Sequence, residues 1–183
     1  MPRLEPSSLT QHIDAMYRAA WALCGSREDA EDLVQDTFAR VLARPRTIQV
    51  GGERAYLMQS LRNTFASRLR TISRRPRTVG PPLEDMAPEA RGIAQPERAA
   101  EMGEILSAIA ALSEDFRLAL VAVDILGLSY QEAATALGTR EATITTRVYR
   151  ARQRIARQFR DAPAAGPSRP SAREGNPPDR SLA

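Results

Sequence analysis

Arginine side chains are concentrated in one short stretch of this sequence. Residues 140–160 contain seven arginines and a single acid, Glu141, whereas the whole chain carries a formal net charge of only +4. Guanidinium groups form forked hydrogen bonds with phosphates and with guanine edges. A solvated basic helix face is the simpler alternative. The concentration of charge favours a polyanionic partner, and each phosphate neutralised should steepen the salt dependence of binding by about 0.9 in log-log slope.

The same stretch has the pattern of a helix-turn-helix. Ser129 and Glu132 are spaced for a reciprocal capping box at the start of a short helix, and Gly138 marks its end. The second helix carries apolar residues three and four positions apart, so they form one stripe that we expect to be buried. These residues are Ile144, Val148, Ala151, Ile155 and Phe159.

Polar residues occupy the side of this second helix that faces away from the apolar stripe. They are Thr145, Thr146, Tyr149 and Gln153. Arginines lie on a neighbouring arc, so one helix could pack, neutralise phosphates and contact base edges at once. The pattern therefore predicts binding in a DNA major groove.

A second group of charged residues lies near the N-terminus, on a helix expected to begin after Ser26. Asp29, Asp32, Gln35 and Asp36 fall at helical spacing on its exposed side. An acidic stripe beside exposed Leu33 or Phe38 would suit docking against a basic partner helix. A solvated acidic face is the alternative.

A third helix, expected over residues 53–73, has the opposite charge. Arg62, Asn63, Arg70 and Arg74 fall within an arc of about 120° that avoids its apolar stripe. Arginine beside asparagine can neutralise a nucleic-acid backbone and hydrogen-bond an exposed base edge. Tyr56 is the nearest candidate for base stacking. Without further evidence, this basic face is only a weak indication of nucleic-acid binding.

The elements that position these residues predict an all-α fold of two small helical domains. Residues 1–75 form the first domain, a Pro-rich flexible linker covers 76–97, the helix-turn-helix domain covers 98–160, and 161–183 form a disordered tail. Fully extended, the 22 linker residues could span on the order of 75 Å.

The sequence lacks the residues that several classes of protein require for their function. One cysteine, Cys24, and one histidine, His12, give no credible zinc site and no catalytic triad, and no Gly-rich phosphate loop is present. We therefore expect no cofactor, no metal and no enzymatic activity. The first residues of the sequence have no apolar run behind a basic start, and no run of eighteen apolar residues occurs. We therefore expect a cytoplasmic protein that does not bind a membrane.

Three motifs occur in an order that resembles the extracytoplasmic-function (ECF) group of bacterial RNA polymerase sigma factors. They are D-A-E-D-L-V-Q-D-T-F over residues 29–38, L-S-E-D-F-R over 112–117 and G-L-S-Y-Q-E-A-A over 127–134. The similarity covers about residues 5–160. It implies that the acidic helix binds the clamp helices of core polymerase through Asp29, Glu31, Asp32, Leu33, Gln35, Asp36 and Phe38.

The resemblance also implies two contacts with promoter DNA. The third helix looks like the segment that captures the melted minus-ten strand, with Asn63 near a flipped base, and Tyr56, Arg62, Arg70 and Arg74 beside it. The helix-turn-helix resembles the minus-35 duplex reader, with Thr145, Thr146, Tyr149 and Arg150 facing bases, and Arg147 and Arg152 contacting phosphates. An anti-sigma factor is a possible further partner.

Some positions depart from the family pattern. Arg140–Ile144 replaces a common Pro-x-Gly-Thr-Val run, and Thr145 stands where a basic or other polar reader is common. Two other readings stay open: a stand-alone helix-turn-helix regulator of duplex DNA, and a helical adaptor that binds only proteins. A regulator normally needs a dimer seam, and the chain shows no sustained heptad pattern. An adaptor leaves the arginine-rich helix unexplained.

Overall fold

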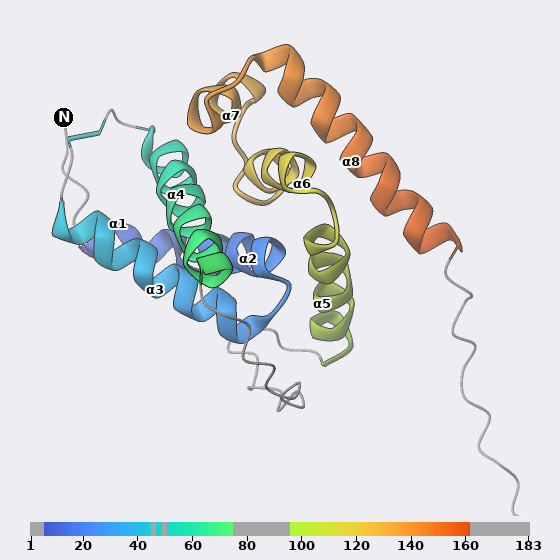
Figure 1. The fold of residues 1–183 in the computed structure, drawn as a ribbon, viewed down its shortest axis with the longest axis horizontal. Coiled ribbons are helices and arrows are strands. Elements are labelled where there is room, and N and C mark those ends of the chain that lie inside the picture. The colour runs from blue at the N-terminus through green and yellow to red at the C-terminus, as the bar shows by residue number, and fades with distance from the viewer. Residues whose placement is uncertain (1–5, 45–46, 49–50, 75–95, 162–183) are drawn as a thin grey trace, which may run out of the picture.

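The computed structural model describes residues 6–44, 47–48, 51–74 and 96–161, and it confirms an all-α fold (Figure 1). Its helices are α1 (Pro6–Leu9), the 3-10 helix η1 (Thr10–His12), α2 (Ile13–Cys24), α3 (Arg27–Ala43), α4 (Glu53–Arg74), α5 (Pro96–Ala110), α6 (Glu114–Leu120), the π-helix η2 (Val121–Ile125), α7 (Tyr130–Leu137) and α8 (Glu141–Asp161). The expected linker and the expected tail lie almost wholly outside the described residues.

Local chemistry sets the helix ends in the N-terminal unit. Gly25 ends α2 with a left-handed φ of 84°, and its N–H donates to the Trp21 carbonyl at 2.8 Å. Ser26 then caps α3, because its Oγ accepts from the Asp29 N–H at 3.2 Å and donates to the Asp29 carboxylate at 2.9 Å. The start of α3 directly after Ser26 thus matches the one expected from the sequence.

The helix-turn-helix in the C-terminal unit is also built as expected. The Ser129–Glu132 capping box opens α7, with the Ser129 N–H donating to Glu132 Oε2 at 2.8 Å. Gly138 ends the helix with a φ of 66°, and Thr139 N–H donates back to the Ala134 carbonyl at 2.9 Å, as in a Schellman motif. Pro96 begins α5 rather than interrupting it, because proline suits the first turn of a helix.

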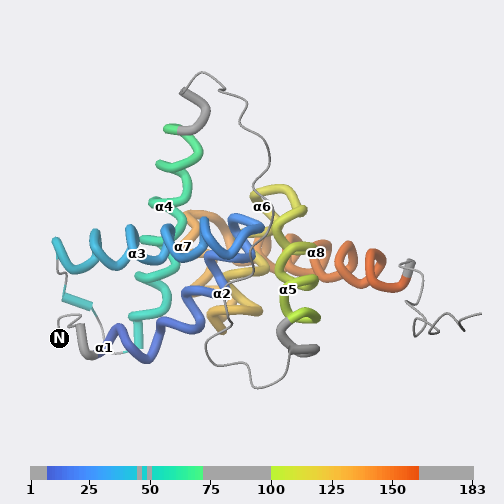
Figure 2. Tube along the Cα trace, turned by 90° about the horizontal axis from the view of Figure 1, so that it is seen from below, coloured from blue at the N-terminus to red at the C-terminus, as the bar shows by residue number. Residues whose placement is uncertain are grey.

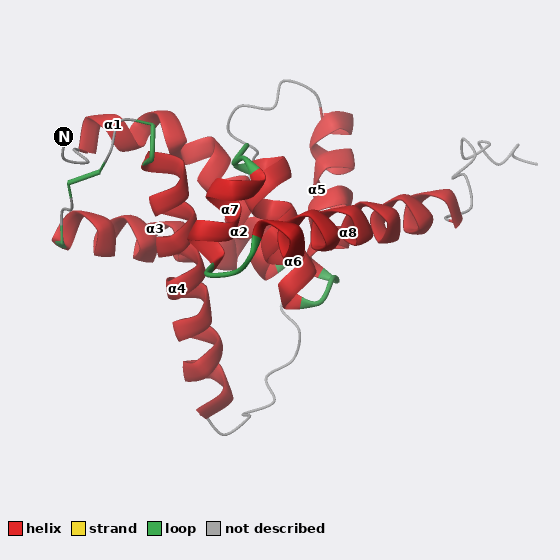
Figure 3. Cartoon of the chain, turned by 90° about the horizontal axis from the view of Figure 1, so that it is seen from above, coloured by secondary structure: helices red, strands yellow, loops and turns green. Residues whose placement is uncertain are grey.

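The two helical units pack against each other. α2 contacts α3 and α4 of its own unit as well as α5, α6 and η2 of the other, and α4 contacts α7. One hydrophobic cluster includes buried residues of both units, from Met16 and Leu23 to Val121 and Ile144. Figure 2 shows the units side by side, and Figure 3 shows the C-terminal part of α8 projecting beyond α5 and α6.

Two features are absent from the residues that the structure describes, a membrane-spanning helix and a metal site. None of the helices described is long and apolar enough to cross a membrane. Within the same residues, no group of three or more histidine, cysteine or acidic side chains is placed to hold a metal ion.

Candidate nucleic-acid interface

Burial of the apolar stripe fixes the orientation of α8. Ile144, Val148 and Ala151 are fully buried, and Ile155 packs partly against the core. The expectation that the whole stripe is buried is wrong at Phe159, which is 41% exposed. The reason is that α8 continues past the helices that cover its first turns, so its last turns have solvent on this side.

The opposite side of α8 presents the predicted base-facing residues to solvent. Thr145, Thr146, Tyr149 and Arg150 are all exposed, and Tyr149 retains 63% of its accessible surface. Each threonine hydroxyl donates to a carbonyl one turn earlier, those of Glu141 and Ala142, at 3.0 Å. Because these protons are engaged, the hydroxyl oxygens remain as outward acceptors for the amino groups of cytosine or adenine.

The two predicted phosphate contacts already have acidic partners within the chain. Arg147 Nη2 lies 2.7 Å from Asp115 of α6. Arg152 forms a forked pair with Asp124 of η2 at 2.6 and 3.0 Å, which raises the pKa of Arg152. These contacts fix both guanidiniums against the body of the unit. Arg150 lies outside these pairs, and its exposed position makes it the better placed of the three for DNA.

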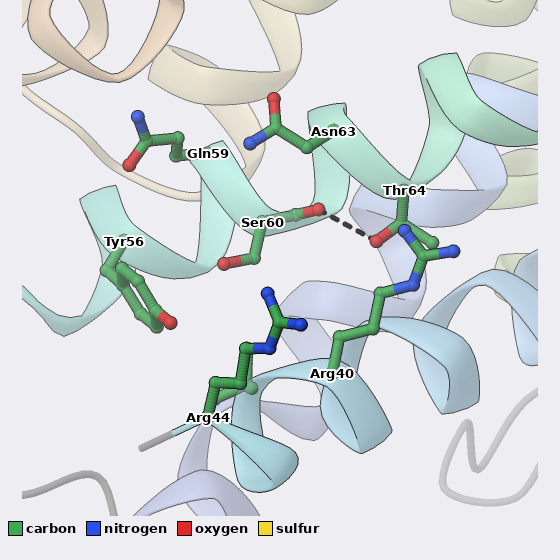
Figure 4. A pocket seen from close by; sticks show the side chains of 8 residues that line it. Arg40, Arg44, Tyr56, Gln59, Ser60, Asn63 and Thr64 are labelled. Carbon is green, nitrogen blue, oxygen red and sulfur yellow. Dashed lines mark hydrogen bonds between the residues drawn. The ribbon is translucent and has the colours of Figure 1, made fainter. Parts of the chain in front are cut away.

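A pocket between α3 and α4 is lined by two of the five predicted minus-ten residues, Tyr56 and Asn63 (Figure 4). Its volume is about 280 Å³, at the small end of the range for ligand pockets. Asn63 and Tyr56 of α4 line it together with Gln59, Ser60 and Thr64, and α3 supplies Val41 and the guanidiniums of Arg40 and Arg44, which reach toward α4. Hydroxyl groups, guanidinium groups and the Tyr56 ring therefore face the space between the helices, and the Gln59 and Asn63 amides lie at its rim, on the side of α4 away from Arg40 and Arg44 (Figure 4). Such a space suits one polar planar group.

The other residues predicted for this face are placed differently. Arg62 is half-buried and donates to Asn63 Oδ1 at 3.2 Å, which orients the asparagine amide. Arg70 is exposed one to two turns along the same helix and donates to Ser67 Oγ at 3.2 Å. The backbone of Arg74 ends α4, and its side chain lies outside the described residues.

The acidic stripe of α3 faces solvent, but one of the residues predicted for the docking face is buried. Asp29, Glu31, Asp32, Gln35 and Asp36 are exposed and Phe38 is half-buried, but Leu33 is fully buried and cannot form part of a docking face. Leu33 falls on the side of α3 that packs into the core, and its carbonyl accepts from the buried Thr37 hydroxyl at 2.7 Å.

Arg68 of α4 holds the acidic stripe in place, a role that the sequence analysis missed. Its Nη2 lies 3.2 Å from Asp32 and its Nε 3.4 Å from Asp36, and Nη1 donates to the Asp29 carbonyl at 3.0 Å. Arg68 lies more than 30 residues from these partners in the sequence, so the pattern of a single helix could not predict the contact. Arg40 and Arg44 were missed too, although their four-residue spacing is visible in the sequence.

Each of the two helical units matches a known protein family. The family described as Sigma-70 region 2 matches residues 9–75, and the family described as Sigma-70, region 4 matches residues 102–155. These matches contain the α3–α4 pocket and the helix-turn-helix, respectively.

Curated relatives and a solved structure resemble the chain along most of its length. ECF RNA polymerase sigma factor SigE of Mycolicibacterium smegmatis is 35% identical over 152 residues, which cover 79% of this chain and 57% of the relative. SigC of Mycobacterium tuberculosis is 33% identical over 156 residues, 81% of each chain. The sigma factor RpoE of Bartonella quintana, solved in complex with the anti-sigma factor NepR, has a TM-score of 0.64 and 26% identity, covering 86% of this chain and 97% of that one.

Proposed function

Because this chain belongs to the ECF group of RNA polymerase sigma factors, we propose that it binds core RNA polymerase, directs it to specific promoters and assists promoter melting. The observation that carries the proposal is the presence in one chain of three surfaces with distinct chemistry. These are the acidic face of α3, the polar pocket between α3 and α4, and the exposed polar side of α8.

Residues 98–160 read the minus-35 duplex in this proposal. The exposed Tyr149 and Arg150 are assigned to base edges together with Thr145 and Thr146. Arg147 and Arg152 keep their roles as phosphate contacts, with Asp115 and Asp124 holding the two side chains in position. The ion pairs would then have to share their guanidiniums with the DNA.

Residues 1–75 take the other two tasks. The α3–α4 pocket receives a base of the melted minus-ten strand, with Tyr56 as an aromatic wall and the Asn63 amide at the rim. Arg62, Arg70 and Arg74 bind the strand's phosphates. Gln59, Ser60, Arg40 and Arg44 join this assignment because they line the same pocket.

The acidic face of α3 is assigned to core polymerase. Its members are Asp29, Glu31, Asp32, Gln35, Asp36 and Phe38, without the buried Leu33. Arg68 fixes two of these carboxylates, which lowers the conformational entropy lost when a basic partner helix binds.

The remaining assignments follow from the same function. The protein acts in the cytoplasm, where transcription takes place, and contributes binding rather than catalysis. An anti-sigma factor is a fitting regulator, because the Bartonella relative was solved with one. A stand-alone regulator of duplex DNA would need neither the acidic face nor the α3–α4 pocket, and the region 2 match argues against it.

Transcription of fragmented genomic DNA from the source organism by its purified core polymerase tests the proposal. Adding the chain should produce RNAs with discrete 5′ ends that are absent with core polymerase alone, when the ends are mapped by sequencing. If the pattern of 5′ ends is the same with and without the chain, the proposal is wrong.

A further inference from the structure

One row of α3 residues reverses its charge along the helix. Asp32, Asp36, Arg40 and Arg44 follow one another at four-residue spacing, which places them along one side of α3. Arg68 of α4 pairs with both carboxylates, at 3.2 and 3.4 Å. The acidic half of the row therefore has its counter-charge on the neighbouring helix.

The basic half of the row has no such partner on α4. Among the residues that the structure describes, neither Arg40 nor Arg44 forms a hydrogen bond or an ion pair. Both guanidiniums instead face the space between the helices (Figure 4). The α4 residues that line this pocket are all uncharged: Tyr56, Gln59, Ser60, Asn63 and Thr64.

The hydroxyls beside the guanidiniums cannot take the place of a carboxylate. Thr64 is buried, and its hydroxyl donates to the Ser60 carbonyl at 2.9 Å. A guanidinium carries five N–H donors and no acceptor, and it binds most strongly to a group that presents two acceptors in one plane. A planar occupant with paired acceptors therefore fits both the charge and the small size of the pocket.

The four bases differ in whether they present two acceptors side by side. Guanine does so with O6 and N7, and cytosine does so with O2 and N3 on the edge that is free in an unpaired strand. In adenine the N6 amino group lies beside both N1 and N7, and in thymine the N3–H separates O4 from O2. An arginine fork therefore matches guanine or cytosine and leaves an unmatched donor against the other two bases.

We propose that Arg40 and Arg44 determine which base the α3–α4 pocket accepts, selecting guanine or cytosine and rejecting adenine and thymine. The inference rests on the proposed function, which assigns the pocket to the melted minus-ten strand and leaves the base open. It gives α3 two tasks, because its acidic half faces core polymerase and its basic end reads the strand.

A promoter library with a randomised minus-ten segment tests this selection. The starting promoter is the one that gives the most abundant factor-dependent RNA in the genomic transcription assay, and each template carries a transcribed barcode. RNA counts divided by template counts then give a preference for each base at each position. With the unmodified chain and core polymerase, one position should favour guanine or cytosine over adenine and thymine at least about fivefold, as a forked base contact allows.

The double variant Arg40→Gln, Arg44→Gln should reduce the preference at that position to less than twofold and leave the preferences at other positions intact. Both side chains are exposed, so their replacement should not unfold the chain. A phosphate contact has a different signature, because its loss lowers the RNA from all templates alike. A uniform fall with the base preference unchanged would overturn the inference.

Arg70→Gln is the matched control, since it removes an exposed arginine of α4 that does not line the pocket. It should lower the RNA from all templates and keep the base preference. If it abolishes the preference as the double variant does, the selection does not reside in Arg40 and Arg44. An unmodified chain that transcribes the library without this preference at any position would refute the base selection alone. Absence of factor-dependent RNA from every template would instead count against the sigma-factor proposal.

Discussion

At the scale of residues, the structure distinguishes side chains free to meet a ligand from those already engaged. Arg150 and Tyr149 are exposed on α8, whereas Arg147 and Arg152 are paired with Asp115 and Asp124. Asn63 is oriented by Arg62 at the edge of the α3–α4 pocket. Under the proposed function, duplex reading and strand capture are assigned to different residues in different units.

The first prediction separates these two tasks. Arg150→Ala should weaken binding of a minus-35 duplex by about 1–3 kcal/mol, the usual worth of a good base contact. Asn63→Ala should leave duplex affinity within twofold and reduce open-complex formation, because the proposal assigns the pocket to unpaired bases alone. Fluorescence anisotropy reports the first quantity and permanganate reactivity of unpaired thymines the second. Equal losses for both variants in both assays would refute this division.

The second prediction concerns Cys24. Burial raises the pKa of its thiol to about 11, so at pH 8 the reactive thiolate is far scarcer than in an exposed cysteine. Alkylation of the folded chain by iodoacetamide should be about 100-fold slower than in denaturant and should accelerate as the pH rises toward 11. Mass spectrometry over time measures both rates, and similar rates would show that the thiol is accessible.

At the scale of elements, helix caps and ion pairs between helices determine where the functional faces point. The capping box sets the start of α7 and so the angle at which α8 leaves the turn. Arg68 ties α4 to the acidic side of α3. Altering one such contact should change stability or binding without removing any residue that touches DNA.

Ser129→Ala should lower the free energy of unfolding by about 1 kcal/mol, the usual cost of losing an N-cap. The Ser129 backbone N–H and hydroxyl donate to Glu132 and lower its pKa. The ionised carboxylate therefore stabilises the fold above its ordinary pKa of about 4.3, and this stabilisation is lost as the pH falls through the lowered value. Urea titrations at pH 7 should reveal the Ser129→Ala difference; no difference would show that the cap contributes nothing.

Asp32→Arg should weaken binding to core polymerase at least tenfold. The change reverses a charge at the centre of the acidic face and also places it beside Arg68. Glu101→Arg on α5 alters the net charge equally at an exposed site outside this face and serves as the control. Affinities can be measured by biolayer interferometry. If both variants bind alike, the docking face lies elsewhere.

At the scale of the whole molecule, features encoded by local sequence were predicted well, whereas contacts between distant segments were not. Periodicity and capping residues predicted the all-α fold, the start of α3 after Ser26 and the helix-turn-helix, because 3.6-residue repeats and caps depend on near neighbours. The burial of Leu33, the Arg68 ion pairs and the packing of α2 on α5 depend on how helices meet, which no single helix pattern encodes. The exposure of Phe159 could not be predicted for the same reason, because only the assembled fold shows where other helices stop packing against α8.

The most direct test of the account is whether the purified chain binds core polymerase. Mixed at micromolar concentration in low salt, the two should co-elute from a gel-filtration column as a 1:1 complex, and the complex should weaken as salt is raised because the α3 face is acidic. Separate elution of the chain and the core enzyme at low ionic strength would contradict the central claim.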